Sequence, residues 1–155
     1  MRGLLLLATH AGALAVGFAA GIYVLPILTA APPPDAAMVE AAEAEAVAVG
    51  TFRRDLRGSD RLHWGEGTIA VTATQAVHRG ALAPGPDYRL YLTRGLVEHE
   101  DGFAAAQKVM IGPVDGFEGF ALALPPGVDP AQWDAALIWC EAFGEFITAA
   151  VLEPR

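Results

Sequence analysis

The chain is short of residues on which several familiar activities depend. It has one cysteine (Cys140), one serine (Ser59), one lysine (Lys108) and no asparagine. A single cysteine excludes an internal disulfide, and it excludes the zinc and c-type haem motifs that take two cysteines from one chain. Ser59 lacks the flanking glycines of a serine hydrolase nucleophile. No glycine-rich loop stands between a strand and a helix, as nucleotide sites require.

Basic side chains are scarce as well. Lysine and arginine number 10 against 18 aspartates and glutamates, for a net charge of −8. Without Arg2, the remaining nine basic residues face all 18 acidic ones, so residues 35–155 carry −9. This balance argues against nucleic acid, whose phosphates select Lys and Arg surfaces. It also argues against docking through a polybasic patch on anionic lipid.

Charge is absent altogether from Gly3 to Ala31. As a helix, Leu4–Leu28 would be about 37 Å long, enough to cross a hydrocarbon core of about 30 Å. The alternative is a cleaved signal peptide, but its apolar region should span only about 7–15 residues. The best cleavage position, before Ala31, also has the bulky Leu28 three residues upstream. We therefore predict an uncleaved transmembrane anchor over residues 1–31, with residues 4–28 in the lipid bilayer.

Flanking charge predicts the orientation of this anchor. Arg2 is the only basic residue before the span, whereas Asp35, Glu40, Glu43 and Glu45 follow it. The positive-inside tendency then places the N-terminus in the cytoplasm. One lysine beside nine arginines, with abundant alanine and glycine, is typical of a GC-rich bacterial genome. We expect a single-pass protein of the bacterial cytoplasmic (inner) membrane with its domain in the periplasm.

Small residues form a stripe within the anchor. Gly17 and Gly21 are spaced as in a GxxxG motif, which lets two helices approach closely. A helix–helix dimer through this face is one reading. The other is that small residues are simply common in membrane spans.

After the anchor the pattern changes twice. Residues 32–46 are rich in Pro, Ala and Glu and are predicted to form a stalk, with room for two or three helical turns. Residues 47–155 then carry short β-branched and aromatic runs bounded by Gly, Pro and Asp. We predict an all-β domain, an antiparallel β-sandwich or small barrel of about seven to eight strands. The strands expected are Ala48–Arg53, Gly67–Thr74, Tyr88–Thr93, Gln107–Ile111, Gly119–Leu124, Ala135–Cys140 and Glu145–Leu152.

Cys140 is the first candidate for chemistry. Period-two alternation places it on the same face as Ala136 and Ile138, so one reading is a small buried core residue. The other is functional, because an unpaired cysteine outside the cytoplasm is open to oxidation and mispairing. His63 precedes Trp64-Gly65 and is either a hydrogen-bonded turn histidine or a second site residue. His78 and His99 stand in polar, turn-like surroundings and are expected to be solvated.

Cofactors are left open by the spacing. Three histidines, one cysteine and two methionines beyond the anchor are enough, by number, for a His₂Cys copper site. However, no His or Met follows Cys140 within a few residues, as it does in copper electron carriers. A non-covalent haem held by His or Cys is not excluded. Haem and copper therefore both stay open, and no metal site is predicted.

Five short motifs occur in an order that resembles the electron-transfer DM-thirteen domain family. They are Gly50-Thr51-Phe52, His63-Trp64-Gly65-Glu66-Gly67, Gly85-Pro86-Asp87, Gly119-Phe120 with Leu124-Pro125, and Ile138-Trp139-Cys140 with Phe143. The resemblance covers residues 47–152. It implies a β-rich extracytoplasmic domain whose lone cysteine takes part in redox chemistry, often beside DOMON domains and membrane cytochromes.

Carried over by position, the resemblance points to Cys140 first and His63 second. Two features depart from the family pattern. No DOMON or other domain is attached, so we expect any redox partner to be a separate protein. Glu141 follows the cysteine, and a neighbouring carboxylate disfavours a thiolate.

Two functional readings follow, and whether the protein is an enzyme is left open by both. In the first, a membrane-anchored extracytoplasmic domain works in electron transfer through Cys140, by mixed disulfide or as a ligand to a metal or haem. In the second, the domain is a non-catalytic binding or structural module with Cys140 in its core.

Overall fold

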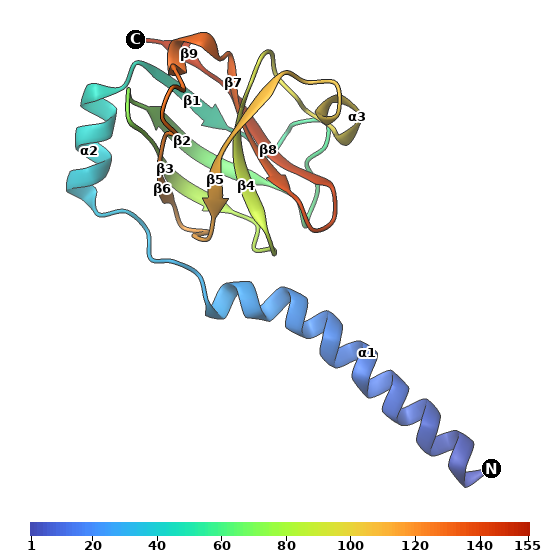
Figure 1. The fold of residues 1–155 in the computed structure, drawn as a ribbon. Coiled ribbons are helices and arrows are strands. Elements are labelled where there is room, and N and C mark those ends of the chain that lie inside the picture. Colours follow the sequence, from blue (N-terminus) through green and yellow to red (C-terminus); the bar gives the residue numbers. More distant parts are fainter.

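Two antiparallel sheets pack face to face in this protein (Figure 1). The structure, a computed structural model, describes residues 1–155. One sheet has five strands in the order β6-β3-β2-β1-β9, and the other has four in the order β5-β4-β7-β8. Their bounds are β1 (Ala48–Phe52), β2 (Gly65–Val71), β3 (Gln75–Leu82), β4 (Tyr88–Thr93), β5 (Lys108–Val114), β6 (Phe120–Ala123), β7 (Ala135–Cys140), β8 (Glu145–Val151) and β9 (Glu153–Pro154). The predicted all-β sandwich is confirmed.

The strand count of seven to eight was too low, chiefly because β3 was missed. The predicted strand Gly67–Thr74 runs through a turn that no Gly or Pro marks. Thr72 makes this turn: its hydroxyl accepts the amide N–H of Gln75 at 3.1 Å, and its own amide donates to the Gln75 carbonyl at 2.8 Å. Because threonine is equally common in strands, the sequence hid the start of the hairpin partner.

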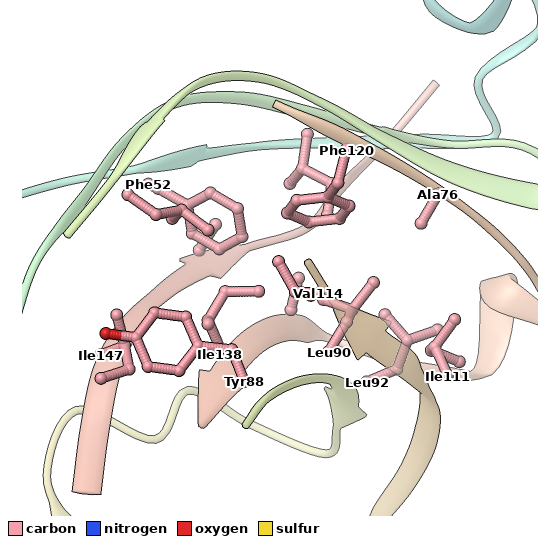
Figure 2. Close-up of a cluster of buried hydrophobic side chains, with 14 of the residues drawn as sticks. Phe52, Ala76, Tyr88, Leu90, Leu92, Ile111, Val114, Phe120, Ile138 and Ile147 are labelled. Atoms are coloured by element: carbon pink, nitrogen blue, oxygen red, sulfur yellow. The ribbon is translucent and has the colours of Figure 1, made fainter. Parts of the chain in front are cut away.

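The core lies between the two sheets. It is a cluster of 19 buried residues contributed by alternate positions of the strands, among them Leu90, Leu92 and Ile138 from the four-stranded sheet (Figure 2). Each large side chain buried in this way stabilises the fold by about 1.5–3 kcal/mol relative to exposure. The opposite face of the same sheet is also covered, where Phe103 stacks on Trp139 with 3.8 Å between ring centroids. Burial on both faces explains why β7 is apolar throughout.

The predicted stalk contains a helix that packs on the domain. Helix α2 (Ala36–Glu45) begins at Asp35, whose side chain accepts the amide N–H of Met38 at 2.8 Å. Val39 and Ala42 are buried against Ala70 and Val77 on the outer face of the five-stranded sheet. Two small apolar residues one turn apart are enough for this contact, and they are easily overlooked in an Ala/Glu-rich segment.

The N-terminal helix α1 (Arg2–Leu28) extends away from the sandwich (Figure 1). It is 27 residues long and none of them is buried, and its length and composition fit a membrane span or a signal anchor. Apart from the nearby backbone of the helix itself, nothing in the chain lies within 4 Å of a Cβ built at Gly17 or Gly21, so dimerisation through that face stays a prediction. The chain enters the domain soon after the helix, where the Ala31 amide donates to the Asp115 carbonyl at 2.8 Å. Two short helical turns, α3 (Glu100–Phe103) and Pro130–Gln132, lie in loops.

Candidate functional site around Cys140

Cys140 ends strand β7 at one end of the sandwich. Tyr88, the first residue of β4, pairs with it on one side, and Glu145, the first residue of β8, on the other. Strand alternation turns its side chain toward the core between the sheets, and only 2% of the residue is exposed. The expectation that Cys140 shares a face with Ala136 and Ile138 is confirmed.

The Gly85-Pro86-Asp87 turn holds this cysteine in place. The thiol donates to the Pro86 carbonyl oxygen, with 3.1 Å between sulfur and oxygen. The Asp87 carbonyl accepts the amide N–H of Glu141 at 3.0 Å. Gly85 lets the Tyr88 ring lie against this turn, because a Cβ there would overlap the ring unless the Tyr88 side chain moved. Two motifs that are far apart in the sequence therefore form one structure.

The surroundings of Cys140 favour the protonated thiol. Burial is the largest cause that raises its pKa, and the carboxylates of Asp87 and Glu145 raise it further. The amide N–H groups of Phe143 and Ala142 act in the opposite direction, because they stabilise a thiolate.

Glu141, the carboxylate suspected from the sequence, is engaged elsewhere. It accepts a hydrogen bond from the hydroxyl of Tyr91, which belongs to the cluster on the outer face of the sheet. Burial, together with this hydrogen bond, raises the pKa of Tyr91 to about 12. Glu141 follows the last residue of β7, and its side chain leaves the strand on the face opposite to that of Cys140. The carboxylate next to the cysteine in sequence is therefore not beside it in space.

A cavity of about 150 Å³ lies beside the cysteine. Its lining comes from both halves of the chain: Ile22 and Tyr23 of α1, and Leu62, His63, Pro84, Gly85, Pro86, Tyr88, Cys140, Phe143, Glu145 and Ile147 of the domain. The structure thus brings together Cys140 and His63, the two residues that the sequence singled out.

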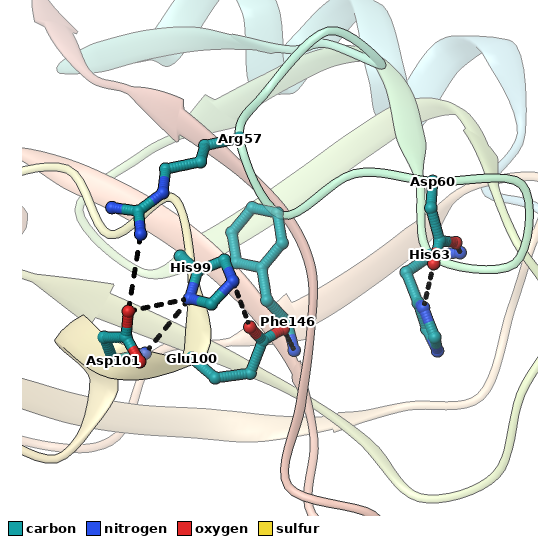
Figure 3. A network of polar contacts seen from close by, with 7 residues as sticks. All are labelled: Arg57, Asp60, His63, His99, Glu100, Asp101 and Phe146. Atoms are coloured by element: carbon teal, nitrogen blue, oxygen red, sulfur yellow. Dashed lines mark hydrogen bonds and ion pairs between the residues drawn. The ribbon is translucent and has the colours of Figure 1, made fainter.

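His63 occupies a turn before β2. The Asp60 carboxylate accepts the amide N–H groups of Leu62 at 2.6 Å and His63 at 2.7 Å, and it lies 3.1 Å from Nδ1 of His63 (Figure 3). Burial opposes ionisation of Asp60, but these hydrogen bonds together hold its pKa below the usual value. The side chain of His63 is 29% exposed. It is a hydrogen-bonded turn histidine that also lines the cavity.

A comparison with known protein families identifies the family of this chain. The family model described as "Electron transfer DM13" matches residues 55–152, more than half of the chain and every strand from β2 to β8. The chain belongs to the electron transfer DM13 family. Comparison with curated proteins and with solved structures gave no match. Cys140, His63 and the Gly85-Pro86-Asp87 turn all lie inside the DM13 match, whereas α1, α2 and β1 precede it.

His78 of the DM13 domain is not solvated, contrary to the expectation from sequence. It is fully buried in β3, between the rings of Phe52 and Phe120 at centroid distances of 5.2 and 5.0 Å. Nε2 lies 3.1 Å from the Glu66 carbonyl, and Nδ1 has no hydrogen-bond partner. Because the acceptor is a carbonyl oxygen, Nε2 carries the proton and the Nδ1 lone pair is left unsatisfied. Burial lowers the pKa of His78 to about 4.

The other polar cluster of the DM13 domain is at its surface. His99 caps α3 and lies 3.0 Å from the Glu100 carboxylate and 3.2 Å from that of Asp101, which also pairs with Arg57 (Figure 3). Figure 3 shows this group well apart from the His63–Asp60 pair. Nowhere in the chain do three or more His, Cys, Asp or Glu side chains group so that they could hold a metal ion.

Proposed function

We propose that this DM13 protein is a membrane-anchored electron-transfer module on the periplasmic side of a bacterial cytoplasmic membrane. Its working group is the Cys140 thiol, which exchanges with a disulfide of a separate partner protein. Family membership supports a redox role. The observation that carries the assignment to Cys140 is that its cavity also contains His63, the only imidazole there.

The proposed step is a thiol–disulfide exchange. The Cys140 thiolate attacks one sulfur of the partner's disulfide, the S–S bond breaks, and the departing sulfur leaves as a thiolate. A thiolate of a second, dithiol-containing protein then attacks the Cys140 sulfur of the mixed disulfide, and the partner leaves with both of its sulfurs reduced. The remaining thiolate of the dithiol protein displaces Cys140 as its own disulfide closes, so two electrons pass from that dithiol to the partner's disulfide. His63 accepts the Cys140 proton at the start, because imidazole is the side chain best matched to proton transfer near neutral pH.

The size of the cavity favours this chemistry over a bound haem. Sites for drug-sized ligands and cofactors occupy about 300–1,000 Å³. The cavity beside Cys140 measures about 150 Å³, room for a reacting sulfur and its substituents.

A second function rests on a different observation. Cys140 is 2% exposed, and its thiol is already satisfied by the Pro86 carbonyl. Those two facts suit a structural module in which the cysteine is a small core residue. The redox function and the structural function predict different reactivity of the thiol.

The test is the alkylation rate of Cys140 in the folded full-length chain. We expect iodoacetamide to react measurably faster than the chain unfolds, with a rate that rises with pH because the thiolate is the nucleophile. His63→Gln should slow the reaction at neutral pH by about tenfold. His99→Gln, at the distant surface cluster, is the matched control and should leave the rate unchanged.

Alkylation only at the rate of global unfolding would establish the structural function and reject the redox one. An optical spectrum and metal analysis of protein purified from its native membrane complete the test. A Soret band would show that haem is bound, and haem ligation would then replace disulfide exchange as the chemistry of this site.

The orientation has its own test. A reporter fused after Arg155 should behave as extracytoplasmic, because Arg2 precedes the span and the acidic residues follow it. Activity of a reporter that works only in the cytoplasm would reject the proposed compartment.

A further inference from the structure

Exposed apolar side chains gather at the mouth of the Cys140 cavity. Outside α1, the two most exposed large apolar residues are Leu62 at 64% and Phe143 at 57%. They come from loops far apart in the sequence, one before β2 and the other between β7 and β8, yet both line this cavity. Because both side chains stay outside the core, they form an apolar rim at the cavity. A single exposed apolar residue would not form such a patch.

The membrane helix reaches the same place. Ile22 and Tyr23, in the last two turns of α1, line the cavity with Leu62 and Phe143. The link between helix and domain is short, because the Ala31 amide already bonds to the Asp115 carbonyl at 2.8 Å. The Cys140 end of the sandwich is therefore the end that faces the anchor, as Figure 1 shows for the lower edge of the domain.

Helix geometry gives the height of this cavity relative to a bilayer. A hydrocarbon core of about 30 Å takes about 20 helical residues. Counted from Leu4, the first large apolar residue after Arg2, the core ends close to Tyr23. Tyrosine is also a residue that prefers the boundary between hydrocarbon and headgroups. The cavity thus lies at the level of that boundary.

We infer that the rim formed by Leu62 and Phe143 rests in the interfacial layer of the bilayer that α1 spans, so that the Cys140 cavity opens onto lipid. The inference rests on the anchor of the proposed function, and it does not depend on the chemistry of the thiol. A surface of −9 net charge gives no attraction to anionic lipid, so apolar insertion beside the tether makes the contact. Arg61, exposed next to Leu62, is the one basic residue adjoining the rim in sequence.

The test measures immersion depth in the full-length chain. In a Cys140→Ala background, a nitroxide is attached at Leu62→Cys or Phe143→Cys, and the protein is placed in phosphatidylcholine vesicles. Collision rates with oxygen, which concentrates in lipid, are compared with those of a water-soluble nickel chelate. We expect an oxygen-to-nickel ratio several-fold higher at both positions than at Val151→Cys.

Val151 is the matched control because it is 52% exposed and lies at the other end of β8, about 20 Å from Glu145. Leu14→Cys, in the middle of α1, reports on the anchor itself. If Leu14 is in lipid and both rim positions behave like Val151, the inference is wrong and the anchor stands. If Leu14 is also in water, the anchor and the proposed location fail together.

A second measurement needs no substitution and covers the case in which the Cys140→Ala chain does not fold. In nanodiscs that contain a headgroup spin-labelled lipid, amide NMR signals of residues 61–63 and 142–144 should broaden, whereas those of residues 149–151 should not. Equal broadening of the two sets would overturn the inference.

Discussion

Cys140 and His78 are titratable side chains buried in the same inter-sheet core, and they are buried in different ways. Cys140 is at the end of its strand, bonded to the Pro86 carbonyl and bordered by a cavity. His78 is in mid-strand, enclosed by Phe52 and Phe120, with one ring nitrogen unsatisfied. On the proposed function, a small reagent reaches Cys140 through its cavity, whereas the ring of His78 is fully enclosed in that core. We therefore expect chemistry with a partner at Cys140 and an effect on stability at His78.

The largest expected difference is in the stability lost when a glycine is replaced by alanine beside each group. Gly80 lies beside His78, and Gly85 lies beside Cys140. At Gly80 an added Cβ would press on the Glu66 carbonyl and lie 2.7 Å from the Gly67 Cα, which are backbone atoms that cannot move aside. At Gly85 it would meet only the Tyr88 ring. We expect Gly80→Ala to lower the free energy of unfolding by about 3 kcal/mol and Gly85→Ala by about 1 kcal/mol.

Urea midpoints of the two variants check this order. Gly112→Ala is the control, because its Cβ would make ordinary contact with Leu122 at 3.8 Å. Gly85→Ala should in addition speed the alkylation of Cys140 by displacing Tyr88. Equal stability losses at the two glycines would show that the surroundings of His78 and Cys140 are equally rigid, contrary to this comparison.

The next effect is a pH dependence that arises from His78. In the folded chain its pKa is lowered to about 4, whereas the unfolded chain takes up the proton at 6.5. As pH falls through this window only the unfolded state is protonated, so the stability present above 6.5 is progressively lost. Between about pH 8 and about pH 5 we expect a loss of about 2 kcal/mol.

Denaturant midpoints across that range measure this loss. His78→Leu should flatten the profile, because the titrating group is gone. His99→Gln leaves His78 in place and should keep the slope. A profile in His78→Leu as steep as that of the parent would show that another group causes the pH dependence.

Substitution of Cys140 should have a smaller effect. Cys140→Ala removes one sulfur from a packed position and should cost about 1 kcal/mol. Cys140→Ser should cost at least as much, because it buries a hydroxyl. If both variants keep the parent's midpoint but lose function, the thiol acts as a reagent and contributes little to packing.

The smallest effect concerns the carboxylate next to Cys140. Tyr91→Phe removes the hydrogen bond to Glu141 and should cost about 1 kcal/mol or less. This variant also tests the position of Glu141, which Tyr91 holds on the outer face. If the carboxylate stays there, the alkylation rate of Cys140 should change little. A clear fall in the rate would show that Glu141 had moved toward the thiol.

The sequence was sufficient for the sandwich and for most of the strands, because alternation and turn residues are local signals. It failed at β3, where Thr72 makes a turn without Gly or Pro. The error at His78 has the same origin: once residues 75–82 are read as a strand, Ala76, His78 and Leu82 share one face, and burial follows. The alternation that continues after Thr72 was the signal that could have identified β3 and the burial of His78.

For the candidate site, sequence order identified Cys140 and His63 but not what surrounds them. The Gly85-Pro86-Asp87 turn lies more than fifty residues before Cys140, and only the pairing of Tyr88 with Cys140 joins the two. Glu141 was misleading for the opposite reason: it is next to Cys140 in sequence, but its side chain points to the other face of the sheet. Contacts of this kind depend on register, which the side-chain pattern of one strand does not contain.

The short passage from Leu28 to Ala31 also decides how this domain meets other molecules. A long flexible linker would let it sample a wide volume above the surface, whereas the bond from Ala31 to Asp115 keeps it beside the end of α1. With α1 in a bilayer, encounters take place within a layer about one domain thick. Their frequency then depends on how many partner molecules share each unit of membrane area. Enlarging the surrounding compartment would dilute a soluble partner, but it would leave the meeting rate of two tethered proteins unchanged.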